Sequence, residues 1–390
     1  MCGIAGWLDR YTDLSQKQQV INSMVATMKS RGPDQEGVFL SSDNTVCLMH
    51  RRLTVIDPQG GAQPMTKEDK HRKCTIVYNG ELYNTKELTE QLTQAGYSFD
   101  THSDTEALLT AYLHWGEDCV EKLNGIFAFA IYEHTTGKLF IARDRIGVKP
   151  FFYYYYKGGL VFGSEIKALL RCPKVRPVVD EQGLMDVFFI GPGRSLGQGI
   201  FKNVEELLPG ECASYKDGVL KKRKYFKLVA RPHIHSKDET IEYTRFLLKD
   251  AITRQLVSDV PLCTFLSGGL DSSIISAVSA DYYRKNGKGI LTTYSVDYKD
   301  NEKYFKKSLF QPNSDSDFIK LISDFAGTNH KNVILDNHSL YYALYDSVKA
   351  RDLPAMTDVD SSLLLFCKEV KKDFTVALSG ECADELFGGY

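Results

Sequence analysis

The chain has 390 residues, 43% of them hydrophobic and 25% charged, and a formal net charge of -2. This length allows two or three domains with a sizeable core, and the balanced charge excludes a strongly basic nucleic-acid or membrane-surface binder. No apolar run of about 18 residues predicts a membrane span, and no secretory signal opens the chain. The nine cysteines are scattered without a C-x-x-C pair, which favours a reducing compartment such as the cytoplasm over a disulfide framework or a zinc site.

The first informative residue is Cys2, which follows Met1 directly in the opening segment MCGIAG. Removal of Met1 would place a thiol and a free α-amine on one carbon. An α-amine titrates at roughly 7.7–8.0, so it can act as a base near neutral pH beside its own nucleophile. N-terminal-nucleophile hydrolases use this arrangement. A structurally idle cysteine is the alternative that the dipeptide alone favours.

Short β-like runs dominate the first 228 residues. The run at 74–78 is followed by Asn79-Gly80, a pair typical of turns. Two hairpins and three helices are predicted in this part, at residues 127–142, 151–162, 15–28, 85–95 and 105–115. The pattern is that of a mixed α+β domain with antiparallel pairing, which we place at 1–220, followed by a basic linker at 221–236.

The pattern changes from residue 237 onward to an alternation of strands and helices. Four short strands are predicted, at residues 262–266, 290–296, 332–335 and 375–378. Helices are predicted before and between them, at residues 239–256, 273–284, 315–326, 339–349 and 361–371. Such alternation predicts a parallel, doubly wound sheet, here in a second domain over 237–390.

The segment 266–273, with the sequence LSGGLDSS, joins the first of these strands to a helix. Its glycines let the backbone turn tightly, and the amides at the start of a helix form a ready anion site. Asp271 suits such a site if a divalent cation bridges its carboxylate to phosphate. The segment is neither a Walker A loop nor a dinucleotide fingerprint, and a Ser/Gly-rich turn with an N-cap is the structural alternative.

This string resembles the pyrophosphate loop of ATP pyrophosphatases, enzymes that split ATP into AMP and pyrophosphate. The fourth strand leads into SGECADELFGGY at 379–390. Carboxylates are thereby placed at the carboxyl end of a parallel strand, where open α/β sheets bind ligands. An acidic helix start that suits the helix dipole is the alternative. Together with the first loop, the segment favours a shared magnesium site.

The two halves together resemble glutamine-hydrolysing asparagine synthetase over nearly the whole chain. The matching segments are MCGIAG (1–6), SRGPD (30–34), RLTVID (52–57), GAQPM (61–65), NGELYN (79–84), SDTE (103–106) and ARDRIG (142–147). The resemblance implies an α+β N-terminal-nucleophile αββα sandwich followed by an α/β doubly wound parallel-sheet adenylating domain. It also implies a cytoplasmic ligase that makes asparagine from aspartate, ATP and glutamine-derived ammonia through β-aspartyl-AMP, with AMP and pyrophosphate as products.

The resemblance assigns roles in the first domain. Cys2 would attack the glutamine side-chain amide to give a thioester and ammonia, with the Asn79 side chain and the Gly80 amide as the oxyanion hole. A planar guanidinium suits a planar carboxylate, and a carboxylate suits an ammonium. The glutamine-binding residues would be Arg52 for the α-carboxylate, Glu81 and Asp104 for the α-ammonium, and Leu53, Thr54, Val55, Ile56, Asn79 and Gly80.

The resemblance assigns roles in the second domain as well. ATP would be bound by Leu266, Ser267, Gly268, Gly269, Asp271, Ser272, Ser273, Val296, Ser379 and Gly380. Mg²⁺ would be held by Asp271 and Asp384, and Glu381 would take part in forming β-aspartyl-AMP. Ammonia would cross between the sites along an apolar internal path, because protonated ammonia is no longer a nucleophile.

Two features depart from the family pattern. Cys382 stands where the family commonly has glycine, and the chain ends at Tyr390 whereas the family continues well beyond this point, so the second domain is expected to be truncated. Two alternatives stay open: an amidotransferase with another acceptor, such as a cell-envelope or peptide carboxylate, and a truncated glutamine- or ATP-binding protein without synthesis. The oligomeric state is open too, with a homodimer as one option.

Overall fold

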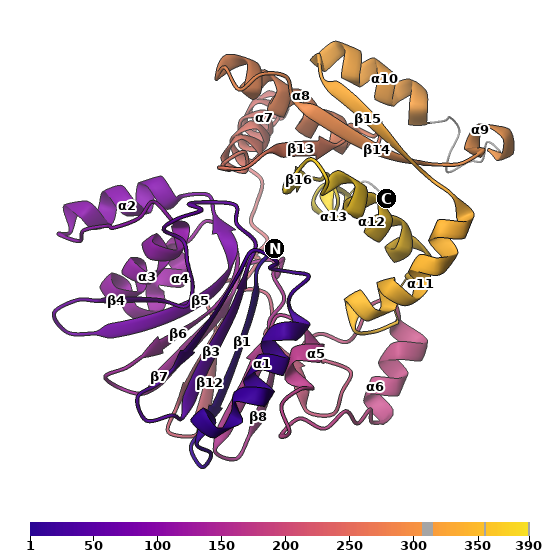
Figure 1. Ribbon diagram of the computed structural model, residues 1–390. Coiled ribbons are helices and arrows are strands. Elements are labelled where there is room, and N and C mark those ends of the chain that lie inside the picture. The colour runs from indigo at the N-terminus through magenta and orange to yellow at the C-terminus, as the bar shows by residue number, and fades with distance from the viewer. Residues whose placement is uncertain (306–314, 355, 389–390) are drawn as a thin grey trace. The chain divides into compact units, whose positions relative to one another are not determined.

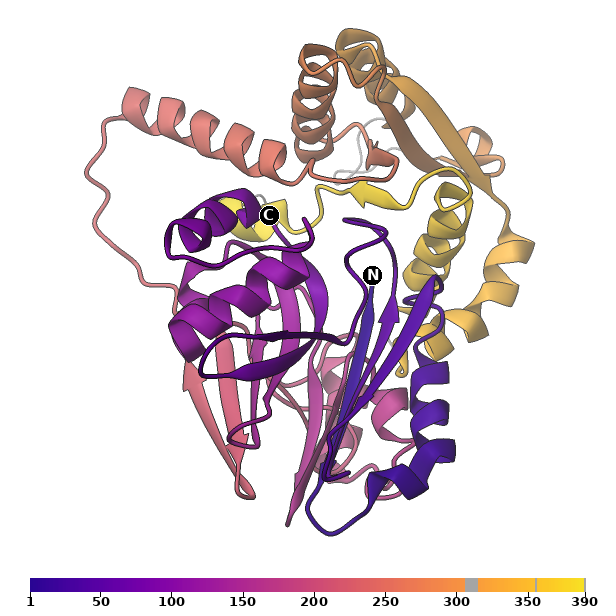
Figure 2. The same ribbon diagram turned by 60° about the vertical axis from the view of Figure 1, so that its left-hand side comes forward.

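The computed structural model describes residues 1–305, 315–354 and 356–388. They form two compact units, Met1–Ala230 and Arg231–Tyr390, each with its own core (Figure 1, Figure 2). The division lies inside the basic segment that the sequence predicts as a linker. None of the helices in the described ranges is long and apolar enough to cross a membrane.

The first unit contains two six-stranded antiparallel sheets. The first sheet consists, in spatial order, of β10 (Val204–Glu206), β8 (Phe152–Tyr156), β9 (Gly159–Gly163), β1 (Gly3–Asp9), β3 (Val46–Arg52) and β2 (Gln35–Leu40). The second consists of β12 (Val219–Lys224), β11 (Glu211–Lys216), β7 (Lys138–Arg143), β6 (Gly125–Glu133), β5 (Lys73–Leu82) and β4 (Met65–Glu68). Both predicted hairpins are confirmed, as β6–β7 and β8–β9.

Helices cover the outer faces of both sheets (Figure 1). The first sheet is covered by α1 (Gln18–Thr27) and α5 (Ile166–Leu169), and the second by α2 (Thr85–Gln94) and α3 (Asp104–Trp115). Shorter helices of this part include η1 (Leu14–Lys17), η2 (Gly116–Asp118) and α4 (Cys119–Lys122). The three predicted helices are therefore confirmed, and the unit is an αββα sandwich.

Strand β6 shows why the four layers hold together. Phe127, Phe129 and Ile131 point into the core under the helices α2 and α3, whereas Ala128 and Ala130 point into the core between the two sheets. Successive side chains of a strand point to opposite faces, so one continuous apolar run supplies both cores. All these side chains are fully buried.

Two local expectations for the first unit are wrong. Asn79-Gly80 is not a turn, because β5 runs through it and pairs Asn79 with Ala128 of β6. The long cross-strand pairing with β6 outweighs the local turn preference of the dipeptide. The expected linker also begins too early, because residues 221–224 belong to the edge strand β12. Their Lys and Arg side chains are the charges that edge strands commonly carry.

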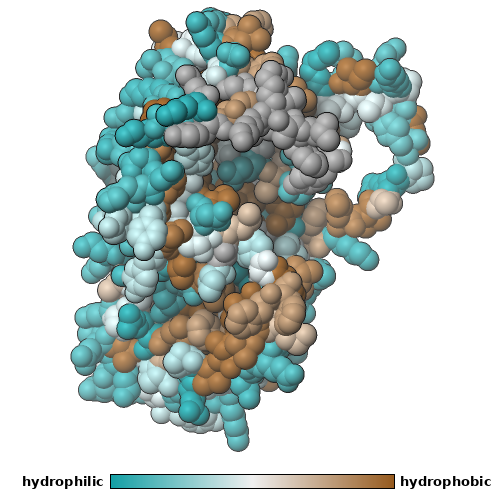
Figure 3. All heavy atoms as spheres, turned by 90° about the vertical axis from the view of Figure 1, so that its right-hand side faces the viewer, coloured by the Kyte–Doolittle hydropathy of each residue, from teal (hydrophilic) through white to brown (hydrophobic). Residues whose placement is uncertain are grey.

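A helical segment that the sequence did not reveal follows the second hairpin. It comprises α6 (Glu181–Met185) and the π-helix η3 (Asp186–Ile190). Buried Asp186 accepts hydrogen bonds from the amide and hydroxyl of Ser195, at 3.0 and 2.8 Å, which fixes the segment. Phe188 and Phe189 are exposed. The segment lies on the side of the first unit drawn in Figure 3, where hydrophobic side chains gather on the surface.

The second unit is built on one four-stranded parallel sheet. Its spatial order is β15 (Asn329–Leu335), β14 (Thr292–Tyr298), β13 (Leu262–Phe265) and β16 (Val376–Leu378). Its helices are α7 (Lys237–Arg254), α8 (Leu270–Lys285), α9 (Asn301–Tyr304), α10 (Asp315–Ala326), α11 (Asn337–Arg351), α12 (Thr357–Val370) and α13 (Ala383–Phe387). The predicted doubly wound parallel sheet is confirmed.

Neighbouring residues of β13 again serve two cores. Leu262 packs with Ala280 of α8 and Ala326 of α10, whereas Cys263 packs with Phe366 of α12. Helices therefore cover both faces of the sheet, and the carboxyl ends of the strands stay free for loops. The segments after β13 and β16 are the two that the sequence singles out for chemistry.

Candidate functional sites

The first candidate site surrounds Cys2, immediately before β1. Its Sγ lies 3.6 Å from the carbonyl oxygen of Leu53, and its own carbonyl accepts a hydrogen bond from Arg31 Nε at 2.9 Å. Burial raises the pKa of the thiol, whereas the nearby N-terminal amine and the Arg52 guanidinium lower it. The thiol is thus held in its protonated form until a neighbouring base accepts the proton, as nucleophile activation by an adjacent base requires.

Asn79 and Gly80 lie side by side on β5. The Asn79 side chain is buried, and its Nδ2 has no hydrogen-bond partner among the described residues. A Cβ on Gly80 would come within 2.3 Å of the Ile126 carbonyl oxygen, so only glycine fits. An unpaired buried donor costs about 1–3 kcal/mol, which a negatively charged oxygen arriving at Nδ2 would relieve.

Two buried carboxylates follow in the same region. Asp104, in the first turn of α3, accepts hydrogen bonds from the Tyr78 hydroxyl at 2.9 Å and from the Leu82 amide at 3.2 Å. Burial nevertheless raises the pKa of Asp104 to about 6. Burial and the charge of Asp104 together raise the pKa of Glu81 to about 7. The charges of Lys149 and of the N-terminal amine oppose this rise at Glu81, but neither carboxylate forms an ion pair among the described residues. The α-ammonium of an amino acid would supply such a direct partner.

Arg52 braces the loop that follows β3. Its Nη1 donates to Gln35 Oε1 and to the Pro58 carbonyl, both at 3.1 Å, and its Nη2 donates to the carbonyls of Ile56 at 3.0 Å and Asp57 at 2.6 Å. The loop contains the predicted glutamine-binding residues Leu53, Thr54, Val55 and Ile56. A substrate carboxylate would have to displace part of these bonds to engage both terminal nitrogens of Arg52.

The structure thus brings Cys2, Arg52, Glu81 and Asp104 into one electrostatic cluster. It adds a residue that the sequence did not reveal, Lys149, whose Nζ lies 3.0 Å from Met1 Sδ. Lys149 comes two residues after the segment 142–147 in the chain, but nothing in the sequence shows that this segment folds back onto the N-terminus.

The second candidate site is the loop between β13 and α8. Ser272 Oγ accepts a hydrogen bond from the Ser267 amide at 3.1 Å, and Ser273 Oγ donates to the Gly269 carbonyl at 2.6 Å. Gly268 has a φ of +85°, and a Cβ there would lie 3.0 Å from the Asp315 carbonyl oxygen. The glycine is needed for both reasons, and the loop places backbone amides at the N-terminus of a 16-residue helix, where anions bind.

The loop after β16 lies against the first one. A Cβ on Gly380 would come within 3.0 Å of the Ser272 nitrogen and 3.1 Å of the Asp271 Cβ. The structure therefore brings Gly380 next to the loop at 266–273, whereas a single site shared by the two loops stays a prediction. Glu381 and Asp384 follow, with Asp384 in the first turn of α13.

The donor set at these loops suits a cation that is shared with phosphate. The described part of the chain contains no group of three or more His, Cys, Asp or Glu side chains that could hold a metal by itself. Mg²⁺ is commonly bound by one or two carboxylates together with substrate phosphates, rather than in an all-protein cage. Asp271 and Asp384 would supply the two carboxylates of such a site.

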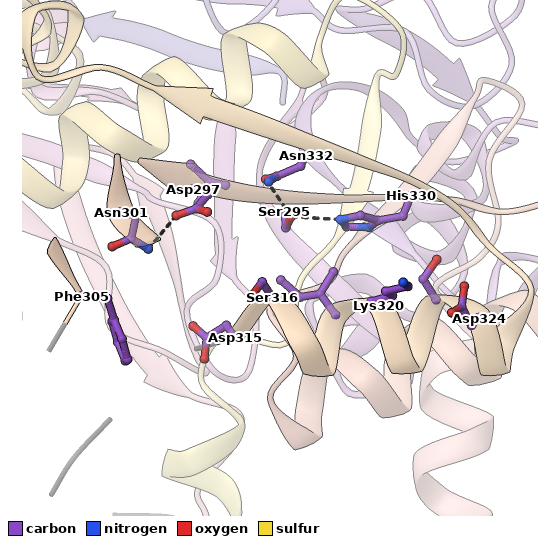
Figure 4. A pocket seen from close by; sticks show the side chains of 13 residues that line it. Ser295, Asp297, Asn301, Phe305, Asp315, Ser316, Lys320, Asp324, His330 and Asn332 are labelled. Atoms are coloured by element: carbon purple, nitrogen blue, oxygen red, sulfur yellow. Dashed lines mark hydrogen bonds between the residues drawn. The ribbon is translucent and has the colours of Figure 1, made fainter. Parts of the chain in front are cut away.

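An open pocket of about 290 Å³ lies between α10 and the strands β14 and β15 (Figure 4). Polar side chains on β14 and β15 are linked along one side of the pocket. Ser295 Oγ lies 3.0 Å from His330 Nε2 and 3.1 Å from Asn332 Oδ1. Thr293 Oγ1 lies 2.9 Å from His330 Nδ1. Burial lowers the pKa of His330, which favours the neutral ring. Of the predicted nucleotide-site residues, Val296 lines this pocket.

Comparisons with known proteins match the two parts of the chain to two different families. Residues 1–226 match the family described as "Glutamine amidotransferase domain", and residues 244–390 match the family described as "Asparagine synthase". The chain is 49% identical over 390 residues to asparagine synthetase (glutamine-hydrolyzing) 3 of Bacillus subtilis, covering 100% of this chain and 63% of the relative. It is 31% identical over 421 residues to a putative asparagine synthetase (glutamine-hydrolyzing) 2 of Methanocaldococcus jannaschii, covering 100% of this chain and 76% of that protein.

Among solved structures, the chain is similar to that of an allosteric regulatory enzyme of purine biosynthesis. The TM-score is 0.45 at 15% sequence identity, and the match covers 86% of this chain and 80% of the other. The chain spans less than two thirds of the length of its Bacillus subtilis relative.

Proposed function

Because the chain belongs to the glutamine-hydrolysing asparagine synthetase family, we propose that its first unit releases ammonia from glutamine at Cys2. We further propose that its second unit is the ATP-binding part of an enzyme that transfers this ammonia to aspartate. The observation that carries the proposal is the buried, unpartnered Nδ2 of Asn79, one residue before Gly80 and two before Glu81.

The proposed glutaminase reaction would use the groups around Cys2. With Met1 removed, the α-amine of Cys2 accepts the thiol proton and Sγ attacks the amide carbon of glutamine. The oxygen becomes negatively charged and is stabilised by Asn79 Nδ2 and the Gly80 amide, and such preorganised donors are commonly a large catalytic contribution. The C–N bond then breaks, the amine returns its proton to the leaving nitrogen, and water hydrolyses the thioester to glutamate. Glu81 and Asp104 hold the substrate α-ammonium.

The synthetase reaction would take place at the two loops of the second unit. The β-carboxylate of aspartate attacks the α-phosphorus of ATP, pyrophosphate leaves, and ammonia then displaces AMP from the acyl carbon to give asparagine. The amides and hydroxyls at 266–273 would bind the pyrophosphate part, and Leu266, Val296, Ser379 and Gly380 would line the nucleotide site. Mg²⁺, which Asp271 and Asp384 would hold, neutralises phosphate charge. Glu381 would act next to the acceptor carboxylate.

Location and assembly belong to the same proposal. The nine cysteines are all free, as suits a reducing compartment such as the cytoplasm. A homodimer stays the assembly that we would test first, by measuring the mass of the protein in solution.

Two assays test the proposal. Cys2→Ala should abolish glutamine hydrolysis, whereas Cys367→Ala, which changes an exposed cysteine of the second unit, should leave it intact. Retained hydrolysis in Cys2→Ala would contradict the assigned nucleophile.

Aspartate should stimulate the exchange of pyrophosphate into ATP, and Asp271→Asn should remove that stimulation. Exchange that responds to another carboxylate but not to aspartate would replace the acceptor, and no exchange with any carboxylate would favour a non-synthesising protein.

A further inference from the structure

The loop at 144–149 is fixed by one buried carboxylate. Asp144 is completely buried, and its two oxygens accept hydrogen bonds from the amides of Ile146 at 3.2 Å, Val148 at 3.0 Å and Lys149 at 2.9 Å. Arg143 Nε also donates to the Lys149 carbonyl at 2.7 Å. Three amides on one carboxylate leave the loop little freedom, so the direction of the Lys149 side chain is set by the fold.

The loop directs Lys149 to the N-terminus of the chain. Its side chain is buried, and its Nζ lies 3.0 Å from the sulfur of Met1, the residue bonded to Cys2. No carboxylate of the described residues forms an ion pair with it. Long cationic side chains are almost never fully buried without a counter-charge, because desolvation of the ammonium is unfavourable. The position of Lys149 is therefore costly to the fold, and packing alone does not explain it.

Other charged groups surround the same point. Arg31 Nε donates to the Cys2 carbonyl from the segment after α1, and the charge of Arg52 acts on Cys2 from the end of β3. Glu81 on β5 and Asp104 on α3 supply negative charge, and the charges of Glu81, Cys2 and Asp144 favour the ammonium form of Lys149 against its burial. Once glutamine binds, its α-ammonium neutralises the two carboxylates and its α-carboxylate neutralises Arg52, whereas Arg31 already pairs with Glu165 at 3.3 Å. Lys149 is then the cation near Cys2 without an ion pair among the described residues.

We propose that Lys149 is a positioning residue for the chemistry of Cys2: its ammonium, facing the mature N-terminus, keeps the Cys2 α-amine in the uncharged form that accepts the thiol proton and stabilises the thiolate. The inference rests on the proposed glutaminase function and on removal of Met1. A cation next to an amine disfavours a second positive charge there, and a cation next to a thiol favours the negative sulfur. Attack on glutamine requires an uncharged amine and a negatively charged sulfur, and the ammonium of Lys149 favours both.

The test is the pH dependence of glutamine hydrolysis. At saturating glutamine, where protonation of Glu81 and Asp104 no longer limits substrate binding, kcat of the full chain should fall at acidic pH as the Cys2 amine becomes protonated. Lys149→Met removes the charge at similar length and should move this acidic limb upward by about one pH unit, within the range that one nearby charge produces. Lys149→Arg keeps the charge and should leave the limb in place. Lys174→Met, a more exposed lysine on the first unit, is the matched control and should have no effect.

A second measurement follows the nucleophile without turnover. The rate of Cys2 alkylation by iodoacetamide should show the same upward shift in Lys149→Met, and Lys149→Gln can replace it if the methionine variant does not fold. An acidic limb that stays in place while the plateau falls would mean a merely structural role and would overturn the inference. If the wild-type chain shows no Cys2-dependent hydrolysis, it is the proposed function that fails. If the wild type is active and the limb of Lys149→Met does not move, only the role of Lys149 fails.

Discussion

The two units present their candidate functional residues in opposite ways. In the first unit the polar groups are buried before any ligand arrives: Asn79 and Asp104 are almost inaccessible, and Glu81 is largely covered. In the second unit the loops stand at the open edge of a sheet, where Gly269 and Glu381 are exposed. The same kinds of side chain thus occupy buried positions in one unit and solvent-facing loops in the other.

The difference determines how much desolvation the binding of each ligand would require. In the first unit, unpaired donors and carboxylates with raised pKa values are already desolvated, so an amino acid that pairs with them relieves an existing cost. In the second unit the loops are open to solvent, so a polyanion with its cation would have to replace water with contacts at a helix N-terminus. Changes to single residues should therefore be felt more sharply in the first unit.

The largest effect is expected for Asn79→Ala. Loss of the proposed oxyanion-hole donor should lower kcat of glutamine hydrolysis by about 10²–10³-fold. Stability should not fall in proportion, because the Nδ2 that is removed has no partner in the described structure. The control is Asn84→Ala, whose side chain donates to the Lys122 carbonyl at 2.9 Å and accepts from the Asn124 amide at 2.9 Å. It should lower the melting temperature and spare kcat, and the reverse pattern for the two variants would break the comparison.

Glu81→Gln should separate stability from binding. Burial raises the pKa of Glu81 from 4.5 to about 7, so its contribution to stability is fully present below the unfolded value and is lost as the pH rises through about 7. The Gln variant carries no such charge, and at about pH 8 it should be more stable than the wild type by about 1–3 kcal/mol. Its KM for glutamine should rise at the same time. Thermal melting against pH checks the first part, and a variant less stable at every pH would contradict it.

The same carboxylates predict how glutamine binding depends on pH. Glu81 and Asp104 have raised pKa values of about 7 and about 6, and the α-ammonium of glutamine pairs only with their ionised forms. The KM for glutamine should therefore rise as the pH falls below about 7, by up to about tenfold per pH unit for each proton taken up, with the two groups titrating as a coupled pair. Glu81→Gln should flatten this dependence. A KM that is constant between about pH 5 and about pH 8 would contradict the buried carboxylates.

Much of this architecture could be predicted from the sequence, and the failures have definite causes. Periodicity indicated the four strands and the five longer helices of the second unit, including the end of α10 at Ala326, because hydrophobic spacing is clear over several turns. The short helices α9 and α13 were not predicted, because four or five residues are too few to show a helical period. Asn79-Gly80 misled, because its turn preference is local whereas the pairing of β5 with β6 is not. The approach of Lys149 to Met1 depends on the closure of two sheets, and no spacing along the chain encodes it. The hydrogen bonds from Arg52 to the carbonyls of Ile56 and Asp57 also form only in the folded loop, so the sequence does not predict them.

The smallest effect, and the one that sharpens the view of the second unit, is expected for Cys382→Gly. Cys382 has φ +69° and ψ 14°, the left-handed region that glycine adopts without a steric penalty. The strain should be about 1 kcal/mol, partly offset by the greater freedom of glycine in the unfolded chain, so the variant should melt at the same temperature or slightly higher. Because the loop is exposed and its neighbours keep their backbone, aspartate-stimulated exchange should not change. A marked loss of exchange would show that the thiol itself takes part, and the second unit would then depend on single side chains as strongly as the first.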